Sequence, residues 1–168
     1  IALASLARLE EALQCLDRAV ELDPSDAAAL NNRGVVLRDL LRDADALASF
    51  DAALALRPEY PEALNNRGNA LQALGRYTEA IECYERALRE RPTYAEALNN
   101  RGNALLALDR CTEALENYHQ ALAIQPGYAE ALSNRSTALL ALCRPGEALE
   151  AAVQALEVHA DYPEALGN

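Results

Sequence analysis

The chain has 168 residues and a formal net charge of −11, and 51% of its residues are hydrophobic against 24% charged. This length fits one domain or a short array of small units, and the apolar fraction is large enough to bury a core, which excludes a disordered tail. No run of about 18 apolar residues occurs, so no membrane-spanning helix is expected. The acidic excess disfavours nucleic acid as a partner.

A repeat of 34 residues organises the whole chain. Two series of residues mark it: Pro24, Pro58, Pro92 and Pro126, and Tyr60, Tyr94, Tyr128 and Tyr162. Four complete units are predicted at 27–60, 61–94, 95–128 and 129–162. A partial unit at 1–26 is expected to hold the end of a first helix plus a second helix, and 163–168 to start a further unit. Because both ends stop inside a unit, the chain is expected to be part of a longer protein.

Each complete unit is predicted to form two helices. In 61–94, apolar residues recur at spacings of three and four, first through Leu64 and Leu71 and then through Ile81 and Tyr84. Gly75 is expected to end the first helix, and Pro92 forces a turn after the second. The predicted helices lie near 27–40, 44–56, 61–74, 78–90, 95–108, 112–124, 129–142 and 146–158, with half helices at the two ends.

The repeat resembles a known family, the tetratricopeptide repeat, in its period and in its small, aromatic and Pro positions. The residues that match are Gly68, Ala80, Tyr84, Ala87 and Pro92, and again Gly102, Ala114, Tyr118, Ala121 and Pro126. The resemblance implies an all-α fold, a right-handed solenoid of stacked antiparallel helix pairs. The fourth unit departs from the pattern, with Ser136 in place of Gly and Ala160 in place of Pro. The Asn-Asn-Arg-Gly runs are similar to bacterial members of the family, and to the repeats attached to O-GlcNAc-transferase-like and SPINDLY-like glycosyltransferases.

The first helix of each unit carries a polar arc rich in asparagine, opposite an apolar arc on the helical wheel. Asn in a helix interior is disfavoured relative to Ala by about 0.5–0.7 kcal/mol, yet here it recurs from unit to unit. A side-chain amide both donates and accepts hydrogen bonds, so it can bind the backbone of an extended peptide. The candidate amides are Asn31, Asn32, Asn65, Asn66, Asn69, Asn99, Asn100, Asn103 and Asn134.

The family resemblance implies that these first helices line a concave groove, and that an asparagine ladder there holds peptide backbone, as in the O-GlcNAc transferase repeats. Glu62, Glu96 and Glu130 are expected at the groove edge, where they favour neutral or basic peptides and repel acidic tails. Two alternatives remain open for the amides. They are solvated helix residues without a ligand, or residues kept alike by recent duplication.

A second ladder consists of arginines on the apolar arc: Arg33, Arg67, Arg101 and Arg135. A buried guanidinium needs a partner, so we expect these residues to be structural and to set the register between units. The candidate partners are the acids Asp17, Asp51 and Glu85 on the preceding second helices, whose counterpart in the third full repeat is His119. Carbonyl groups at helix ends are the alternative partners.

No catalytic centre, cofactor site or metal site is predicted. Cys15, Cys83, Cys111 and Cys143 show neither C-x-x-C spacing nor a nearby His pattern, and free thiols favour a reducing, cytoplasmic location. His119 and His159 stand alone, without a nucleophile or a second acid at usable spacing. The segment itself is therefore not expected to be an enzyme.

The sequence favours a protein–protein interaction scaffold that binds an extended peptide segment in the concave groove. One alternative is the substrate-recruiting arm of a larger glycosyltransferase. Another is a scaffold that assembles end to end, because unpartnered apolar faces at the two ends of a repeat array favour self-association.

Overall fold

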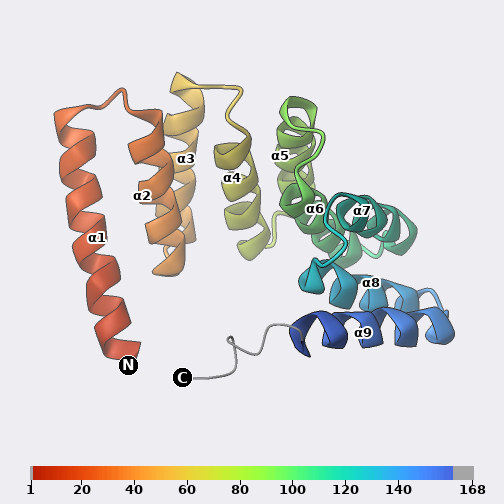
Figure 1. Ribbon diagram of the computed structural model, residues 1–168. Coiled ribbons are helices and arrows are strands. Elements are labelled where there is room, and N and C mark those ends of the chain that lie inside the picture. The colour runs from red at the N-terminus through yellow and green to blue at the C-terminus, as the bar shows by residue number, and fades with distance from the viewer. Residues whose placement is uncertain (1, 161–168) are drawn as a thin grey trace. The chain divides into compact units, whose positions relative to one another are not determined.

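The computed structural model describes residues 2–160. They form helices only, joined by short turns (Figure 1), at Ala2–Leu22 (α1), Ala27–Asp39 (α2), Asp43–Leu56 (α3), Pro61–Ala73 (α4), Tyr77–Glu90 (α5), Ala95–Ala107 (α6), Cys111–Ile124 (α7), Ala129–Ala141 (α8) and Pro145–Ala160 (α9). The start predicted at 163–168 lies outside the described residues. The chain divides into two compact units between Glu90 and Arg91, unit 1 and unit 2.

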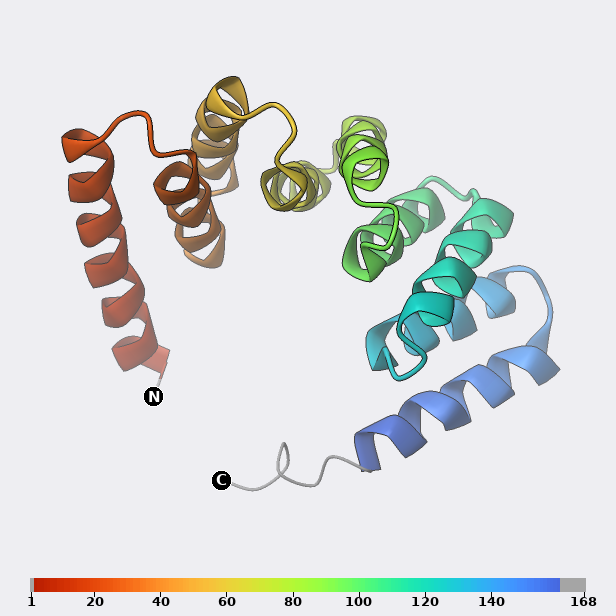
Figure 2. The same cartoon turned by 45° about the horizontal axis from the view of Figure 1, so that its top comes forward.

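Consecutive helices pack in pairs within each unit, which confirms the predicted all-α fold of stacked helix pairs. In unit 1, α2 lies beside α3 and α4 beside α5, and α3 also packs against α4 (Figure 1). In unit 2, α6 pairs with α7 and α8 with α9, as the turned view also shows, and α7 packs against α8 (Figure 2). The second helix of one repeat is thus covered by the first helix of the next repeat, as α3 is by α4 and α7 by α8.

The helices from α2 onward begin and end within about two residues of the predicted bounds, because strong local signals mark their ends. The turn between the paired helices carries a residue with positive φ at one repeat phase: Leu41, Gly75, Asp109 and Cys143. This left-handed residue ends the first helix of each pair. Asp26 begins α2 by accepting hydrogen bonds from the backbone N–H groups of Ala28 and Ala29.

The partial unit at 1–26 differs from its prediction. It was expected to hold two helical segments, but residues 2–22 form one continuous helix, α1. The reason lies at the turn position, which Ala7 occupies in this unit. Ala7 lies one repeat period before Leu41 and two before Gly75. Residues 2–22 contain no Gly or Pro and are rich in Ala, Leu, Glu and Arg, which favour an uninterrupted helix.

Each of the first three complete units is centred on an aromatic ring that packs against a glycine. Phe50, Tyr84 and Tyr118 are fully buried. A Cβ atom added at Gly68 would lie 2.5 Å from Cε1 of Tyr84, so only glycine lets the two helices approach this closely. In the fourth complete unit both partners change together, because Ser136 replaces the glycine and Ala152 replaces the ring.

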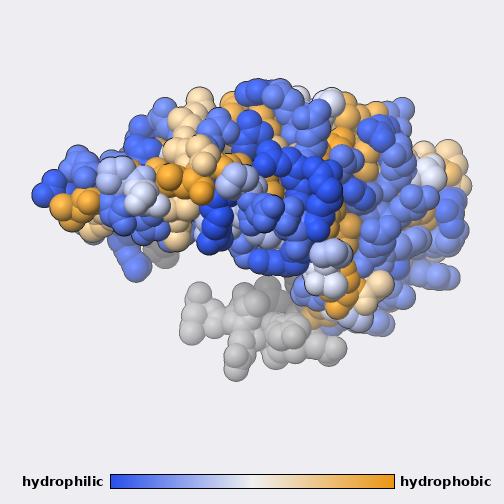
Figure 3. Space-filling model, turned by 90° about the horizontal axis from the view of Figure 1, so that it is seen from above, coloured by the Kyte–Doolittle hydropathy of each residue, from blue (hydrophilic) through white to orange (hydrophobic). Residues whose placement is uncertain are grey.

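The surface outside this core is largely polar. Most of the face in Figure 3 is hydrophilic, and it is interrupted by smaller apolar patches. Among the described residues, no helix is both long enough and apolar enough to cross a membrane. The described part of the chain thus buries its apolar residues mainly between helices.

Candidate functional site

The candidate site is the polar side of the first helices, α2 and α4 in unit 1 and α6 and α8 in unit 2. Within each unit the two first helices are direct neighbours, since α2 contacts α4 and α6 contacts α8. Their asparagines therefore come close enough to bond from one repeat to the next. The structure divides these asparagines into three groups with different surroundings.

The inner amides, Asn31, Asn65 and Asn99, are buried, with exposed fractions of 5%, 0% and 0%. The helical wheel placed them on the exposed arc, and the structure corrects that expectation. A wheel describes one helix by itself, whereas in a stacked array neighbouring helices cover part of the polar arc as well. These three side chains do not lie open to a ligand, and Asn31 and Asn99 bond to the next repeat.

The outer amides are Asn32, Asn66, Asn100 and Asn134. Asn32 is exposed and the other three are half-buried. Asn66 donates from Nδ2 to Oδ1 of Asn31 over 3.0 Å, and Asn134 donates in the same way to Asn99, also over 3.0 Å. Each bond uses one of the two Nδ2 hydrogens, so the amide keeps a donor and its carbonyl oxygen for a ligand. Asn31 thus orients Asn66, and Asn99 orients Asn134.

Asn69 and Asn103 accept hydrogen bonds from tyrosine hydroxyls of the core. The Tyr84 hydroxyl donates to Oδ1 of Asn69 over 2.8 Å, and the Tyr118 hydroxyl donates to Asn103 over the same distance. A comparison of the units in the sequence indicates this role, whereas a helical wheel of one helix does not. Where the ring is Phe50 the matching residue is Val35, and where the ring is lost at Ala152 it is Thr137. The amide is present only where there is a hydroxyl to satisfy.

Acidic side chains lie in the first turn of three first helices, α4, α6 and α8. Glu62 is half-buried, while Glu96 and Glu130 are exposed. Glu130 accepts a hydrogen bond of 3.0 Å from Nδ2 of Asn99. Burial raises the pKa of Tyr128 to about 12, and the negative charges of Glu130 and Glu96 add to the shift. Two carboxylates and a neutral phenol therefore lie near the inner amide Asn99, which also accepts the bond from the outer amide Asn134.

The first two arginines of the ladder have the predicted partners and a further contact each. Arg33 pairs with Asp17 and donates to the Ser49 hydroxyl over 2.6 Å. Arg67 donates to Asp51 over 2.7 Å and to the sulfur of Cys83 over 2.9 Å. Each arginine thus joins the second helix before it to the second helix after it.

Arg101 and Arg135 donate to side-chain amides. Arg101 donates to Oδ1 of Asn117 over 2.7 Å, and Arg135 to Oε1 of Gln154 over 3.0 Å. In the described part of the chain, Nε of Arg135 is buried without a hydrogen-bond partner. His119, which stands in place of the acid before Arg135, is no substitute for aspartate because an imidazole carries no negative charge. Burial lowers the pKa of His119, and the charges of Arg135 and Arg144 lower it further, so the ring is neutral.

The described residues contain no group of three or more His, Cys, Asp or Glu side chains that could hold a metal ion. Cys83 and Cys111 are buried and Cys15 and Cys143 exposed, all four as free thiols. Burial raises the pKa of Cys83, with the Arg67 guanidinium opposing the shift, so this thiol is a poor nucleophile at neutral pH.

Comparison with known families agrees with this geometry. Models of the tetratricopeptide repeat match residues 61–94 and 93–161, and a model described as a TPR repeat matches 2–40 and 42–75. The chain is built of tetratricopeptide repeats. A search of curated protein sequences found no match.

Solved structures of tetratricopeptide repeat (TPR) proteins share the fold. A crystal structure of MamA is similar with a TM-score of 0.83 at 22% identity, covering 96% of this chain and 94% of that one. YrrB, described as a TPR protein with an unusual peptide-binding site, gives 0.74 at 28% identity, covering 98% and 85%. The first TPR of Spaghetti (RPAP3), bound to the HSP90 peptide SRMEEVD, gives 0.69 at 24% identity, covering 72% and 96%.

Proposed function

We propose that this TPR array is a protein–protein interaction module that binds an extended peptide along its first helices. The outer amides, Asn32 and Asn66 in unit 1 and Asn100 and Asn134 in unit 2, make the contacts to peptide backbone. The observation that carries the proposal is the pair of bonds from Asn66 to Asn31 and from Asn134 to Asn99, each 3.0 Å long.

These bonds support binding because they preorganise the ligand groups. A half-buried amide that is already oriented by a fully buried partner loses little side-chain entropy when a peptide arrives. An amide with one free donor and one free acceptor matches the N–H and C=O of an extended peptide and is indifferent to its side chains. Two similar structures, YrrB and RPAP3, are described with a peptide-binding site and with a bound peptide, which supports the same use here.

The charge of the site favours a neutral or basic peptide. Glu62, Glu96 and Glu130 flank the amides, and the chain carries a formal net charge of −11. An acidic segment such as the one bound to RPAP3 would be repelled by these carboxylates. The glycosyltransferase alternative stays a prediction that depends only on the Asn-Asn-Arg-Gly runs.

A peptide array tests the proposal. The chain is applied to immobilised peptides of about 12 residues with acidic, neutral and basic sequences, and the retained protein is measured for the original chain and for an Asn66→Ala, Asn134→Ala variant. We expect the original chain to bind neutral and basic peptides and the variant to lose most of that binding, since buried hydrogen bonds to a ligand contribute about 1 kcal/mol or more each.

A matched control separates binding from stability. Asn69→Ala, Asn103→Ala removes two amides from the same helices, one turn away, that bond to tyrosines inside the core. This control variant is expected to lower the melting temperature and to keep peptide binding at temperatures where it is folded. Equal loss of binding in both variants, or none in either, would contradict a ligand role for the outer amides.

A further inference from the structure

Each ladder arginine of unit 1 has two partners, one on each neighbouring second helix. Nε of Arg67 donates to Asp51 of α3 over 2.7 Å, and its Nη1 donates to the sulfur of Cys83 of α5 over 2.9 Å. Arg33 uses the same two nitrogen atoms for its partners on α1 and α3. In both cases Nε bonds to a carboxylate on the preceding second helix, and Nη1 bonds to an acceptor on the second helix of its own repeat.

Arg135 of α8 stands at the same repeat position, but both partner positions have changed. His119 occupies the position of the carboxylate, and Ala151 occupies that of the second acceptor. A neutral imidazole carries no negative charge, and a methyl group accepts no hydrogen bond. In the part of the chain that the structure describes, Nε of Arg135 is accordingly buried without a hydrogen-bond partner. A buried donor without an acceptor is costly, so an acceptor from outside the chain is favoured there.

A repeat that follows α9 would not supply these partners. The partners of Arg67 lie on α3 and α5, which are the second helix before it and the second helix of its own repeat. For Arg135 the corresponding helices are α7 and α9, and both are present in unit 2. The unpaired Nε is therefore a consequence of His119 and Ala151, and not of the place of this repeat in the array.

The side of the ladder on which the carboxylates lie is open to solvent. The Asp51 side chain is 57% exposed, although α4 and α5 follow it in unit 1. Beside the first arginine of the ladder, a surface hollow of about 470 Å³ has Asp17 and Glu21 in its walls. At the positions of these two acids α7 carries His119 and Ala123, neither of which bears a carboxylate. A ligand that brings a carboxylate thus meets no acid at these two positions.

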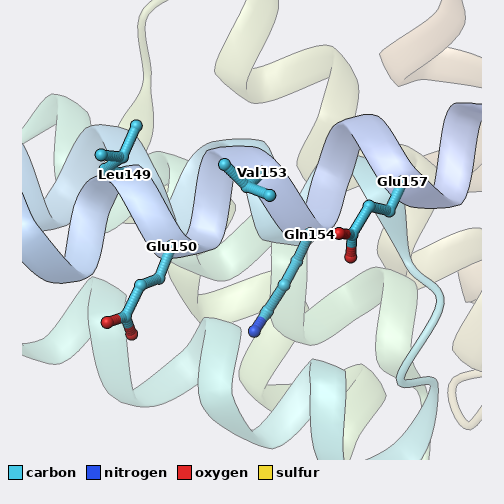
Figure 4. A pocket seen from close by; sticks show the side chains of 5 residues that line it. All are labelled: Leu149, Glu150, Val153, Gln154 and Glu157. Atoms are coloured by element: carbon cyan, nitrogen blue, oxygen red, sulfur yellow. The ribbon is translucent and has the colours of Figure 1, made fainter.

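Gln154 of α9 is the side chain that such a ligand displaces. Its Oε1 accepts a hydrogen bond of 3.0 Å from Nη2 of Arg135. In Figure 4, Gln154 extends from α9 to the same side as Glu150, beside a shallow hollow of about 430 Å³. Gln154 is exposed, and exposed side chains exchange rotamers within nanoseconds. A carboxylate forms two parallel hydrogen bonds to a guanidinium, whereas one amide oxygen forms a single bond here.

We propose that Arg135 binds a carboxylate group from outside the chain through Nε and Nη2. Arg144 shows the geometry, since its Nε and Nη2 donate to the two carboxylate oxygens of Glu147 over 2.7 and 2.6 Å. The ligand class is an organic carboxylate, either a small acid or an acidic side chain of a partner protein. This site faces the second helices α7 and α9, and it does not depend on the outer amides of the first helices.

The reporter is the Nε–H signal of Arg135 in a ¹H–¹⁵N spectrum of the full chain, assigned as the signal that Arg135→Lys removes. Sodium acetate replaces sodium chloride at a constant ionic strength of about 0.1 M, so that screening does not change. We expect a saturable shift of the Arg135 signal. The Nε–H signal of Arg67, which already bonds to a carboxylate, is expected to stay in place.

Two tripeptides identify the source of the carboxylate. Acetyl-Gly-Asp-Gly-amide offers an acidic side chain, and acetyl-Gly-Asn-Gly-amide is its neutral match. We expect the aspartate peptide to shift the Arg135 signal and the asparagine peptide to leave it in place. A lower Kd for the aspartate peptide than for acetate assigns an acidic side chain of a partner as the ligand, and a Kd equal to that of acetate assigns a small acid.

A matched pair of variants changes only the residue at the position of the acid. His119→Asp supplies the carboxylate from within the chain, as Asp51 does for Arg67. Its Arg135 signal should be shifted already in chloride, its response to acetate should weaken about tenfold or more, and its melting temperature should rise by about 2–4 °C. His119→Asn adds no charge and should keep the acetate response. His119 is exposed, so both variants keep their fold, which circular dichroism checks.

Two results would overturn the proposal. The first is an Arg135 signal that acetate and the aspartate peptide leave in place, or that the asparagine peptide shifts equally. The second is an equal acetate response in His119→Asp and in the original chain, because an internal carboxylate would then not compete for the same two nitrogen atoms.

Discussion

The left-handed residue of the turn between paired helices is a position where glycine is favoured but where only one repeat has glycine. Leu41 has φ 59° and is 86% exposed, whereas Gly75 at the same phase has φ 73°. A residue with a Cβ in this region costs about 1–2 kcal/mol more than glycine, partly offset by the greater entropy that glycine has in the unfolded chain. Leu41→Gly is therefore expected to stabilise the protein by about 1 kcal/mol, measured by urea unfolding.

The reverse change provides the control. Gly75→Ala places a Cβ at φ 73° and is expected to lower stability by a similar amount, with no loss of contacts since an added Cβ meets open space there. If both variants unfold at the urea concentration of the original chain, the turn position does not limit stability.

The pair of Tyr84 and Asn69 offers a test of coupling between side chains. Asn69→Val removes the 2.8 Å bond of the buried phenol, whose contact to Gln72 is longer at 3.3 Å, and is expected to cost about 1–2 kcal/mol. Adding Tyr84→Phe removes the hydroxyl and reproduces the Val35–Phe50 pair that the first complete unit already uses. The double variant is expected to be less destabilised than the sum of the single variants, by about 0.5–1 kcal/mol in a double-mutant cycle. Strict additivity would contradict the hydrogen bond.

These residues also show where sequence reasoning was sufficient and where it failed. The wheel identified the polar arc, but it could not separate the buried Asn65 from the half-buried Asn66, because the distinction depends on the neighbouring repeat. The role of Asn69 was readable from the joint change of Val35 with Phe50 and Thr137 with Ala152, a comparison between units that a wheel of one helix does not make.

At the scale of elements, the period of 34 determined helix positions well because the same stop signals recur in every unit. It failed at α1, where Ala7 replaces the turn residue and the helix continues through. It also predicted the partners of two arginines correctly, since Asp17 and Asp51 keep one phase. The partner of the last arginine, Arg135, was not predicted, because its acceptor is Gln154, which does not lie at the repeat position of Asp17 and Asp51.

The pair of Arg67 and Asp51 joins α4 to α3 and should contribute to the stacking of repeats. The Arg67 side chain is 24% exposed and that of Asp51 57% exposed, so water screens the pair in part. Asp51→Ala is expected to lower stability by about 1 kcal/mol and the melting temperature by about 2–4 °C, measured by differential scanning calorimetry. Glu79→Ala removes a carboxylate that pairs with Arg76, directly before the same helix, and should shift the transition less. An equal shift in the two variants would assign Asp51 no special part in joining the helices.

At the scale of the whole molecule, the acidic excess is the property that composition predicted most directly, and it affects any charged partner. Because surface carboxylates act through solvent, their effect falls as salt shortens the Debye length, which is about 10 Å at 0.1 M and about 3 Å at 1 M. This dependence separates a charge preference from backbone recognition by amides, which salt affects little.

Binding of a basic peptide is accordingly expected to weaken with salt, while binding of a neutral peptide of the same length stays nearly constant. Raising NaCl from about 0.05 to about 0.5 M should raise the Kd of the basic peptide several-fold in fluorescence anisotropy, since most of its added attraction is screened over that range. The variant Glu62→Gln, Glu96→Gln, Glu130→Gln should flatten that slope and leave the neutral peptide unchanged. Equal slopes for the two peptides would show that the carboxylates beside the amides do not select the ligand, and would leave hydrogen bonding by the outer amides as the basis of recognition.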